Sequence, residues 1–436
     1  MGTKQILIII PVLIIFSYLF DAFSRKTKFP SVLLLIGTGM VSRAIADWYG
    51  FAGLEMLTAL IAVLGTIGLI LIVLEGALEL QIKKESMGTL FSGFTAALVI
   101  LVVNIWVVGQ LITLFTDISP SLSIVLAVPL SIISSAVAIP SAAGLLQQDR
   151  EFVVYESTFS DILGILIFNY ALGQYHKEEV LFAASQLLQL GAQLIGIVLL
   201  SLAIAFALFQ LLKRITHHVK FFLILALLIL LYALGKFLHL PALVTIFIFG
   251  LFLGNIKTLF PKFLSQYVNP EKIEKDLHEF HVLTGESTFL VRTFFFLFFG
   301  FSITLDTFLG VEPYFYGLLI LGAMLGVRYA YFGITQWQLQ PSTRVFLSPR
   351  GLISILLFFQ LQESQIPELQ NQIIDERVLL IIIIFSMLVM LLGTIRSPIS
   401  SSTDELELTI TNPEIELPTP NDSLNENNSD VPDTEK

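Results

Sequence analysis

The sequence predicts an all-α polytopic membrane protein, and three observations support that fold class. Only 13% of the 436 residues are charged and 55% are hydrophobic, whereas a soluble protein carries about 25% charged residues. The mean hydropathy is +0.85. Many apolar segments reach the roughly 20 residues that a helix needs to cross a bilayer. A soluble enzyme, a nucleic-acid-binding protein and a disordered chain are therefore excluded.

Apolar runs bounded by charged residues, proline or glycine predict about thirteen membrane-spanning helices. They lie at about 5–21, 30–48, 54–81, 89–116, 121–146, 151–173, 185–212, 221–238, 241–256, 286–304, 313–333, 343–361 and 376–395. The first run follows Lys4, and basic residues rather than a small-residue cleavage site flank its far end. We therefore expect a retained helix there, not a signal peptide.

Two of the spans contain residues that interrupt a helix. The fifth contains Pro129 and Pro140 around the polar pair Ser134–Ser135, and the twelfth contains Pro349 and Gly351. Interrupted helices at corresponding places in two halves are the best indication of a transporter site in a sequence. The fifth span counted from the first matches the twelfth counted from the eighth. We therefore expect a six-plus-six inverted repeat, joined by the seventh span.

The distribution of charge predicts the topology and the domain organisation. Loops after odd-numbered spans hold most of the lysines and arginines, which marks them as cytoplasmic. The N-terminus is then outside and the C-terminus cytoplasmic, in the cell membrane. The net charge is −10, of which residues 397–436 contribute −9 from ten acids and Lys436. We expect a transmembrane domain over 1–396 and an acidic, disordered cytoplasmic tail over 397–436.

One further segment and one absent residue type complete this organisation. Residues 264–285 mix apolar and charged positions, which predicts an amphipathic connector at the cytoplasmic surface. The chain has no cysteine, so disulfides and thiolate metal sites are excluded.

Ionisable residues inside the spans are candidate functional residues, because a charge at mid-bilayer costs roughly 2.5–3.5 kcal/mol on insertion scales. They are Glu75, Glu156, Asp161, Arg292 and Arg350, with Arg328 nearer the end of its span. In the sixth span, Ser157 and Asp161 are spaced i,i+4 and lie on one face, and Glu156 and Ser160 form a second such pair. A carboxylate beside a hydroxyl suits a monovalent cation or a proton. Alternatively, the two serines satisfy carbonyls of their own helix.

Four runs resemble the monovalent cation/proton antiporter superfamily, and most closely its sodium/proton exchanger branch of the NhaP and NHE type. They are GLILIVLEGALEL at 68–80, ESTFSD at 156–161, FFFLFFGFSI at 294–303 and SPRG at 348–351. The resemblance covers all the predicted spans in order.

The resemblance implies roles for individual residues. Asp161 is similar to the essential aspartate that takes a cation and a proton alternately, and Ser157 to its hydroxyl ligand. Glu75 resembles a third-span glutamate that reaches the site. Glu156 and Arg350 resemble a structural pair that joins the sixth and twelfth spans. Arg292 stands where the family has a buried base.

The sequence departs from this branch at two places. Ser160 stands where the branch has asparagine, and Ser134, Ser135 and Ala136 stand where it has Thr-Asp-Pro. The second carboxylate is therefore missing, and the pair Ser134–Ser135 resembles the potassium-efflux branch.

These observations together predict a secondary antiporter that exchanges a monovalent cation, which we expect to be Na⁺, for H⁺. With one acidic group at the core, competition at Asp161 implies one-for-one, electroneutral exchange by alternating access. The resemblance implies a homodimer in the lipid bilayer. No phosphate-binding motif occurs, so we expect no cofactor and no nucleotide or nucleic-acid partner.

Two alternatives remain at this point. A K⁺/H⁺ antiporter or K⁺-efflux system of the same fold is favoured by Ser134–Ser135. The carboxylate Glu156 argues against it, as does our expectation that no nucleotide-binding domain follows the last span. A membrane-embedded enzyme is disfavoured, because neither H-E-x-x-H nor G-x-S-x-G occurs.

Overall fold

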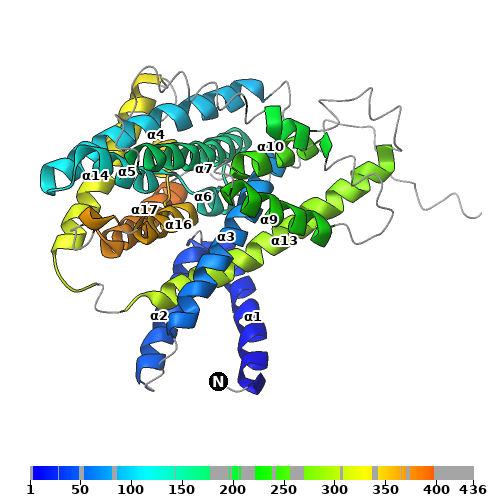
Figure 1. The fold of residues 1–436 in the computed structure, drawn as a ribbon, viewed down its shortest axis with the longest axis horizontal. Helices are drawn as coiled ribbons and strands as arrows, with labels where there is room; N and C mark the ends of the chain where they lie inside the picture. Colours follow the sequence, from blue (N-terminus) through cyan, green and yellow to red (C-terminus); the bar gives the residue numbers. More distant parts are fainter. Residues whose placement is uncertain are drawn as a thin grey trace, which may run out of the picture. The chain divides into compact units, whose positions relative to one another are not determined.

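A computed structural model of the chain is nearly all α-helical, with no strand in the part that it describes (Figure 1). The described residues are 3–27, 29–48, 54–80, 86–142, 144–176, 196, 199–204, 206–207, 221–237, 242–255, 270–304, 308–335, 342–364, 366–369 and 374–396. All of them belong to one compact unit, Met1–Ser397. The expected tail, 397–436, lies outside the described residues.

Helices occur at the predicted places wherever the spans fall within the described residues. Their bounds are α1 Thr3–Thr27, α2 Ser31–Trp48, α3 Leu54–Glu79, α4 Met87–Phe115, α5 Pro120–Ser131, α6 Ser135–Ser141, α7 Gln147–His176, α9 Phe221–Phe237, α10 Ala242–Gly254, α13 Pro270–Ser302, α14 Glu312–Thr335, α15 Ser342–Phe346, α16 Leu352–Glu363 and α17 Glu376–Arg396, with a 3₁₀ turn at Pro367–Leu369. Within the described residues, six segments are long and apolar enough to cross a membrane. Most of the seventh span, 185–212, lies outside them, so thirteen spans and the inverted repeat stay predictions.

Both expected interruptions are confirmed. The fifth span divides into α5 and α6, with an extended segment at 132–134 between them. The twelfth divides into α15 and α16, separated by residues 347–351. Pro349 explains the second break, because a proline disfavours the helical conformation at the residue before it and provides no N–H.

The expected connector at 264–285 differs from the structure. Its described part, from Pro270, is the first half of α13, a single 33-residue helix that continues through the tenth span. In α13, Gly300 lies against the backbone of Ile36 in α2, while Gly39 of α2 lies against the backbone of Leu297. These glycines allow α13 to pack closely on α2, and α13 also packs on α3.

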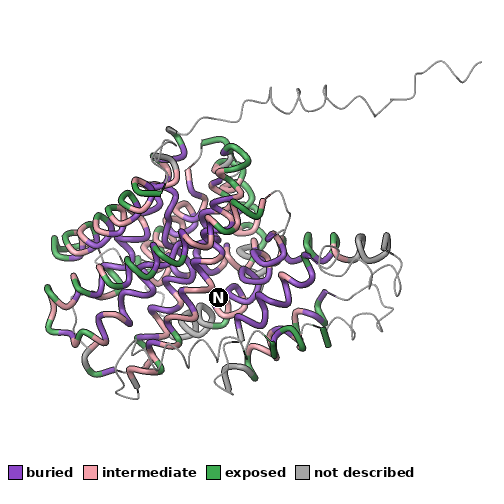
Figure 2. The backbone as a smooth tube through the Cα atoms, turned by 90° about the horizontal axis from the view of Figure 1, so that it is seen from above, coloured by how far each residue is buried: buried purple, intermediate pink, exposed green. Residues whose placement is uncertain are grey.

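A second group of helices surrounds the interrupted pair, whereas α10 and α9 pack on α3 and α1 packs on α2. Helix α4 packs against α5, α7 and α14, and α14 also packs against α17. Of the interrupted helices, α6 packs on α7 and α16 packs on α5. In Figure 2, most buried residues lie in the middle of the group of helices, and most exposed residues lie at its outer edges. Large apolar side chains such as Phe91 and Trp106 are 67% and 62% exposed. An apolar outer surface is what contact with lipid requires.

Candidate functional site

The extended segments of the two interrupted helices meet directly. The backbone N–H of Ser134 donates to the carbonyl of Pro349 over 2.9 Å. A Cβ on Gly351 would lie 2.6 Å from Ser134 Oγ, so the absence of a side chain there allows the two segments to approach. The breaks of the fifth and twelfth spans therefore form one crossing point.

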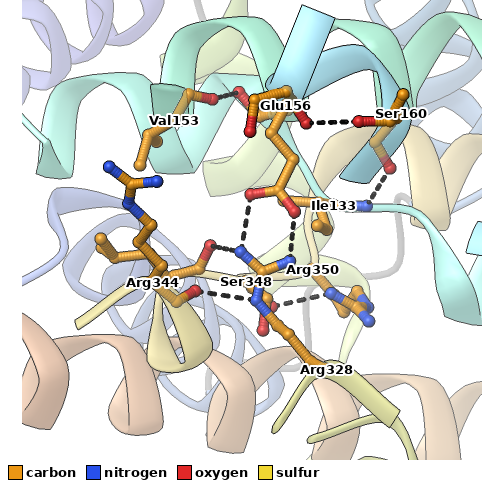
Figure 3. A network of polar contacts seen from close by, with 12 residues as sticks. Ile133, Val153, Glu156, Ser160, Arg328, Arg344, Ser348 and Arg350 are labelled. Carbon is orange, nitrogen blue, oxygen red and sulfur yellow. Dashed lines mark hydrogen bonds and ion pairs between the residues drawn. The ribbon is translucent and has the colours of Figure 1, made fainter. Parts of the chain in front are cut away.

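Helix α7 holds this crossing through two consecutive side chains. The Oγ of Ser160 accepts the N–H of Ile133 at 3.0 Å, and Asp161 Oδ2 accepts the N–H of Ser135 at 3.1 Å (Figure 3 shows the first contact). Buried backbone N–H groups are nearly always paired. Because the break removes helical partners, the side chains of α7 satisfy these two amides.

Asp161 has one carboxylate oxygen in this structural role and one that is not used. The residue is 3% exposed, and among the described residues its Oδ1 has no hydrogen-bond partner. The same is true of the hydroxyl of Ser134, which is 2% exposed. A buried carboxylate oxygen without a protein donor is suited to hold a proton or a monovalent cation.

The hydroxyl of Ser157 binds a carbonyl of its own helix, which is one of the two roles that the sequence pattern allows. Its hydroxyl donates to the carbonyl of Val153 at 2.7 Å, one turn earlier in α7. Its proton therefore satisfies a helix carbonyl, while its oxygen lone pairs remain able to bind a cation.

Glu75 lies beside a cavity of about 560 Å³. Ser135, which binds Asp161 through its amide, lines the same cavity, as do Glu79, Gly76 and Arg292. The guanidinium of Arg292 donates to the carbonyl of Ala136 at 3.0 Å and so connects α13 with α6. The structure thus brings Glu75 and Arg292 to one cavity, which Ser135 beside the crossing point also lines.

The expected pairing of Glu156 with Arg350 is wrong, because Glu156 pairs with Arg328 of α14 (Figure 3). Arg328 binds both carboxylate oxygens, Nη2 to Oε2 at 2.6 Å, and both residues are 1% exposed. Arg328 Nε also donates to the carbonyl of Arg344 at 2.8 Å. The ion pair therefore joins α7 to α14 and, through a carbonyl, to α15.

Arg350 instead binds uncharged groups. It donates to the carbonyls of Leu130 and Ser348, each at 2.8 Å, and its Nη2 lies 3.2 Å from Met324 Sδ. Its own N–H donates to Ser386 Oγ. Within the described part of the chain it forms no ion pair. The guanidinium lies at the C-terminal end of α5, where a helix favours a positive charge.

Sequence reasoning named Arg328 but did not assign it a partner, and it missed the buried Thr158. Arg328 lies nearer the end of its span than Arg350, and position along a span alone does not identify a partner for Glu156. Thr158 is 3% exposed and packs against Gly76 of α3. Its place three residues before Asp161 was the available signal. In the described residues, no three His, Cys, Asp or Glu side chains gather as a metal site.

Known proteins share both the sequence pattern and the fold of this chain. The family described as "Sodium/hydrogen exchanger, transmembrane" matches residues 12–401. A structure of the sodium proton antiporter MjNhaP1 from Methanocaldococcus jannaschii at pH 8 is similar, with a TM-score of 0.66 and 19% identity, over 91% of this chain and 96% of that one. An electron-microscopy structure of the same antiporter has a TM-score of 0.66 and 20% identity, over 96% of this chain and 100% of the other. No curated protein sequence matches significantly.

Proposed function

This chain belongs to the sodium/hydrogen exchanger family, and from that premise we propose that it exchanges Na⁺ for H⁺ at Asp161. Family membership makes the chain an integral membrane cation/proton antiporter, a transporter and not an enzyme. The cation, the stoichiometry and the residues that carry the exchange are our proposal.

The observation that carries the proposal is the position of Asp161. Its carboxylate is buried at the crossing of two interrupted helices, with Oδ2 bound to Ser135 and Oδ1 unpaired among the described residues. Transporter sites lie at such interrupted helices. An ionised carboxylate binds a cation, and the same group binds a proton only when the cation has left. Mutual exclusion at one group couples the two flows in opposite directions.

The arrangement of charges supports electroneutral exchange. Ser135, not a second acid, follows the break beside Asp161 as the first residue of α6, and it contributes its backbone amide. Glu75 shares its cavity with Arg292, which offsets its charge. One negative group then alternates between one cation and one proton, and each full cycle moves no net charge.

Two groups of helices suggest the moving parts. The interrupted helices pack with α4, α7, α14 and α17, whereas α13 packs with α2 and α3; α6 and α16 contact α3 where the two groups meet. We propose that the first group shifts against the second to give alternating access. We further propose an inverted repeat of thirteen spans, a homodimer, and a cell-membrane orientation with the N-terminus outside and the C-terminus cytoplasmic.

K⁺ is the second candidate cation, and a specific observation favours it. The hydroxyl of Ser134 is buried and unpaired in the described region, which offers a neutral oxygen one residue before Ser135, the position where the family branch has its aspartate. Neutral oxygens suit a more weakly hydrated cation such as K⁺. Ion competition therefore belongs in the first experiment.

The test is proton flux into proteoliposomes that contain a pH dye, with Na⁺, Li⁺ or K⁺ added in turn at two clamped potentials. We expect Na⁺-driven flux that is independent of the potential and absent in Asp161→Asn. Asp149→Asn is the matched control, because Asp149 lies on α7 but pairs with Arg344 outside the site. A folded wild-type protein without cation-driven flux would overturn the proposal, and flux with K⁺ alone would replace the cation.

A further inference from the structure

We propose that the hydroxyl of Thr158 is a further ligand of the transported cation and sets the selectivity among small cations. The inference rests on the function proposed above and adds a residue to its site. It places the cation between Asp161 of α7 and the cavity beside α3.

The first step is the position of Thr158 on α7. An α-helix turns about 100° per residue, so Ser157 lies about 40° to one side of Asp161 and Thr158 about 60° to the other. Residues three apart on a helix have Cβ atoms about 5–6 Å apart. The carboxylate and the threonine hydroxyl can therefore converge on one small cation above the helix surface.

The second step is the state of the hydroxyl itself. Thr158 is 3% exposed, and in the described part of the molecule its Oγ1 has no hydrogen-bond partner. Other buried threonines of the spans behave differently: Thr284 and Thr288 each donate to the carbonyl one turn earlier at 2.7 Å. A hydroxyl that only needed a partner would make the same local bond. Among the described residues, the Thr158 oxygen makes no such bond.

The third step is what the hydroxyl faces. A Cβ placed on Gly76 would lie 3.4 Å from Thr158 Oγ1 and 3.3 Å from its methyl group. Gly76 lines the cavity that contains Glu75 and Ser135. The side chain of Thr158 therefore packs on a residue of the cavity wall that has no side chain, one position after Glu75. Ser135 lines the same cavity and donates its N–H to Asp161, so Thr158 and Asp161 each contact a residue that lines this cavity.

The chemistry of the oxygens indicates the ligand. A carboxylate with neutral hydroxyl oxygens is a hard-oxygen site for cations that bind through oxygen. Each added oxygen replaces part of the water that a cation loses on entry. Because small cations hold water most strongly, loss of one oxygen should weaken Li⁺ and Na⁺ more than K⁺.

The test compares Thr158→Val with Thr158→Ser. Valine keeps the shape of threonine and removes the oxygen; serine keeps the oxygen and removes the methyl group. Both purified variants and the wild type are measured in two ways: the KM for Na⁺, Li⁺ and K⁺ in proteoliposomes, and the cation concentration that half-maximally raises the thermal unfolding temperature in detergent. Choline at equal ionic strength is the control. A cation that binds only the folded state stabilises it, so the second readout is independent of turnover.

We expect Thr158→Val to raise both Na⁺ values by about tenfold or more and the K⁺ values less, and Thr158→Ser to stay within about twofold of the wild type. The opposite pattern, a normal Thr158→Val and a weakened Thr158→Ser, would assign Thr158 to packing against Gly76 and overturn the inference. If the wild type exchanges and Asp161→Asn does not, this result leaves the proposed function intact. An inactive wild type would remove both.

Discussion

Removal of Arg328 should destabilise the protein more than removal of any other basic side chain among the described residues. In Arg328→Met, the Glu156 carboxylate remains 1% exposed without its partner, and stranding one charge of a buried pair costs about 3–5 kcal/mol. The carbonyls of Arg344 and Leu347 also lose a donor, at about 1 kcal/mol each. The total of about 5–7 kcal/mol is a large part of the 5–15 kcal/mol that a folded domain typically has.

The assay is a double-mutant cycle in mixed micelles, with the free energy of unfolding measured for Arg328→Met, Glu156→Gln and the double variant. Because the two residues share the interaction, the double variant should lose less stability than the two single losses together, with a coupling of about 1–3 kcal/mol. Arg43→Met is the matched control. Arg43 pairs with the half-exposed Asp47, and exposed pairs of this kind contribute about 0.3–0.5 kcal/mol.

Two results would refute this reasoning. The first is additivity of Arg328→Met and Glu156→Gln within about 0.5 kcal/mol, the usual limit for independent sites. The second is a stronger coupling of Glu156→Gln with Arg350→Met than with Arg328→Met, which would restore the pairing expected from the sequence.

Three further outcomes are expected. Gly351→Ala should reduce the exchange rate of the folded protein by about tenfold or more, because the alanine Cβ would lie 2.6 Å from Ser134 Oγ. Adding Ser134→Ala to this variant should restore part of the rate, and a flux assay that shows no such rescue would count against the contact. Gly300→Ala should lower the free energy of unfolding by about 1–3 kcal/mol, because a Cβ at this position would meet the backbone of Ile36. Gly322→Ala is the control, since a Cβ there has nothing within 4 Å, and equal melting temperatures of the two variants would contradict this packing. If cation and proton compete at Asp161, the KM for Na⁺ should rise as the pH falls, by at most about tenfold per pH unit; a KM independent of pH would exclude competition.

Much of the fold could be predicted because the bilayer constrains it. A spanning segment must satisfy its backbone internally and present apolar side chains to lipid, so runs such as 89–116 and 313–333 indicate helices by their length and composition alone. Pro349 and the prolines of the fifth span likewise indicate interruptions through local backbone chemistry. The connector before the tenth span was misjudged because a continuous helix and a separate amphipathic helix have the same local pattern.

The candidate site was predictable only in part. By itself, the sequence determined that Asp161 is a buried acid on a helix, with Ser157 one turn before it and interrupted helices elsewhere in the chain, since spacing and hydrophobicity are local properties. Only the tertiary structure decided that Glu156 pairs with Arg328, that Arg350 binds the end of α5, and that Ser135 donates to Asp161. Each of these contacts joins helices far apart in the chain, and every buried charge has several chemically suitable partners. Which one it meets depends on helix packing, as where Gly351 allows the two interrupted helices to approach each other.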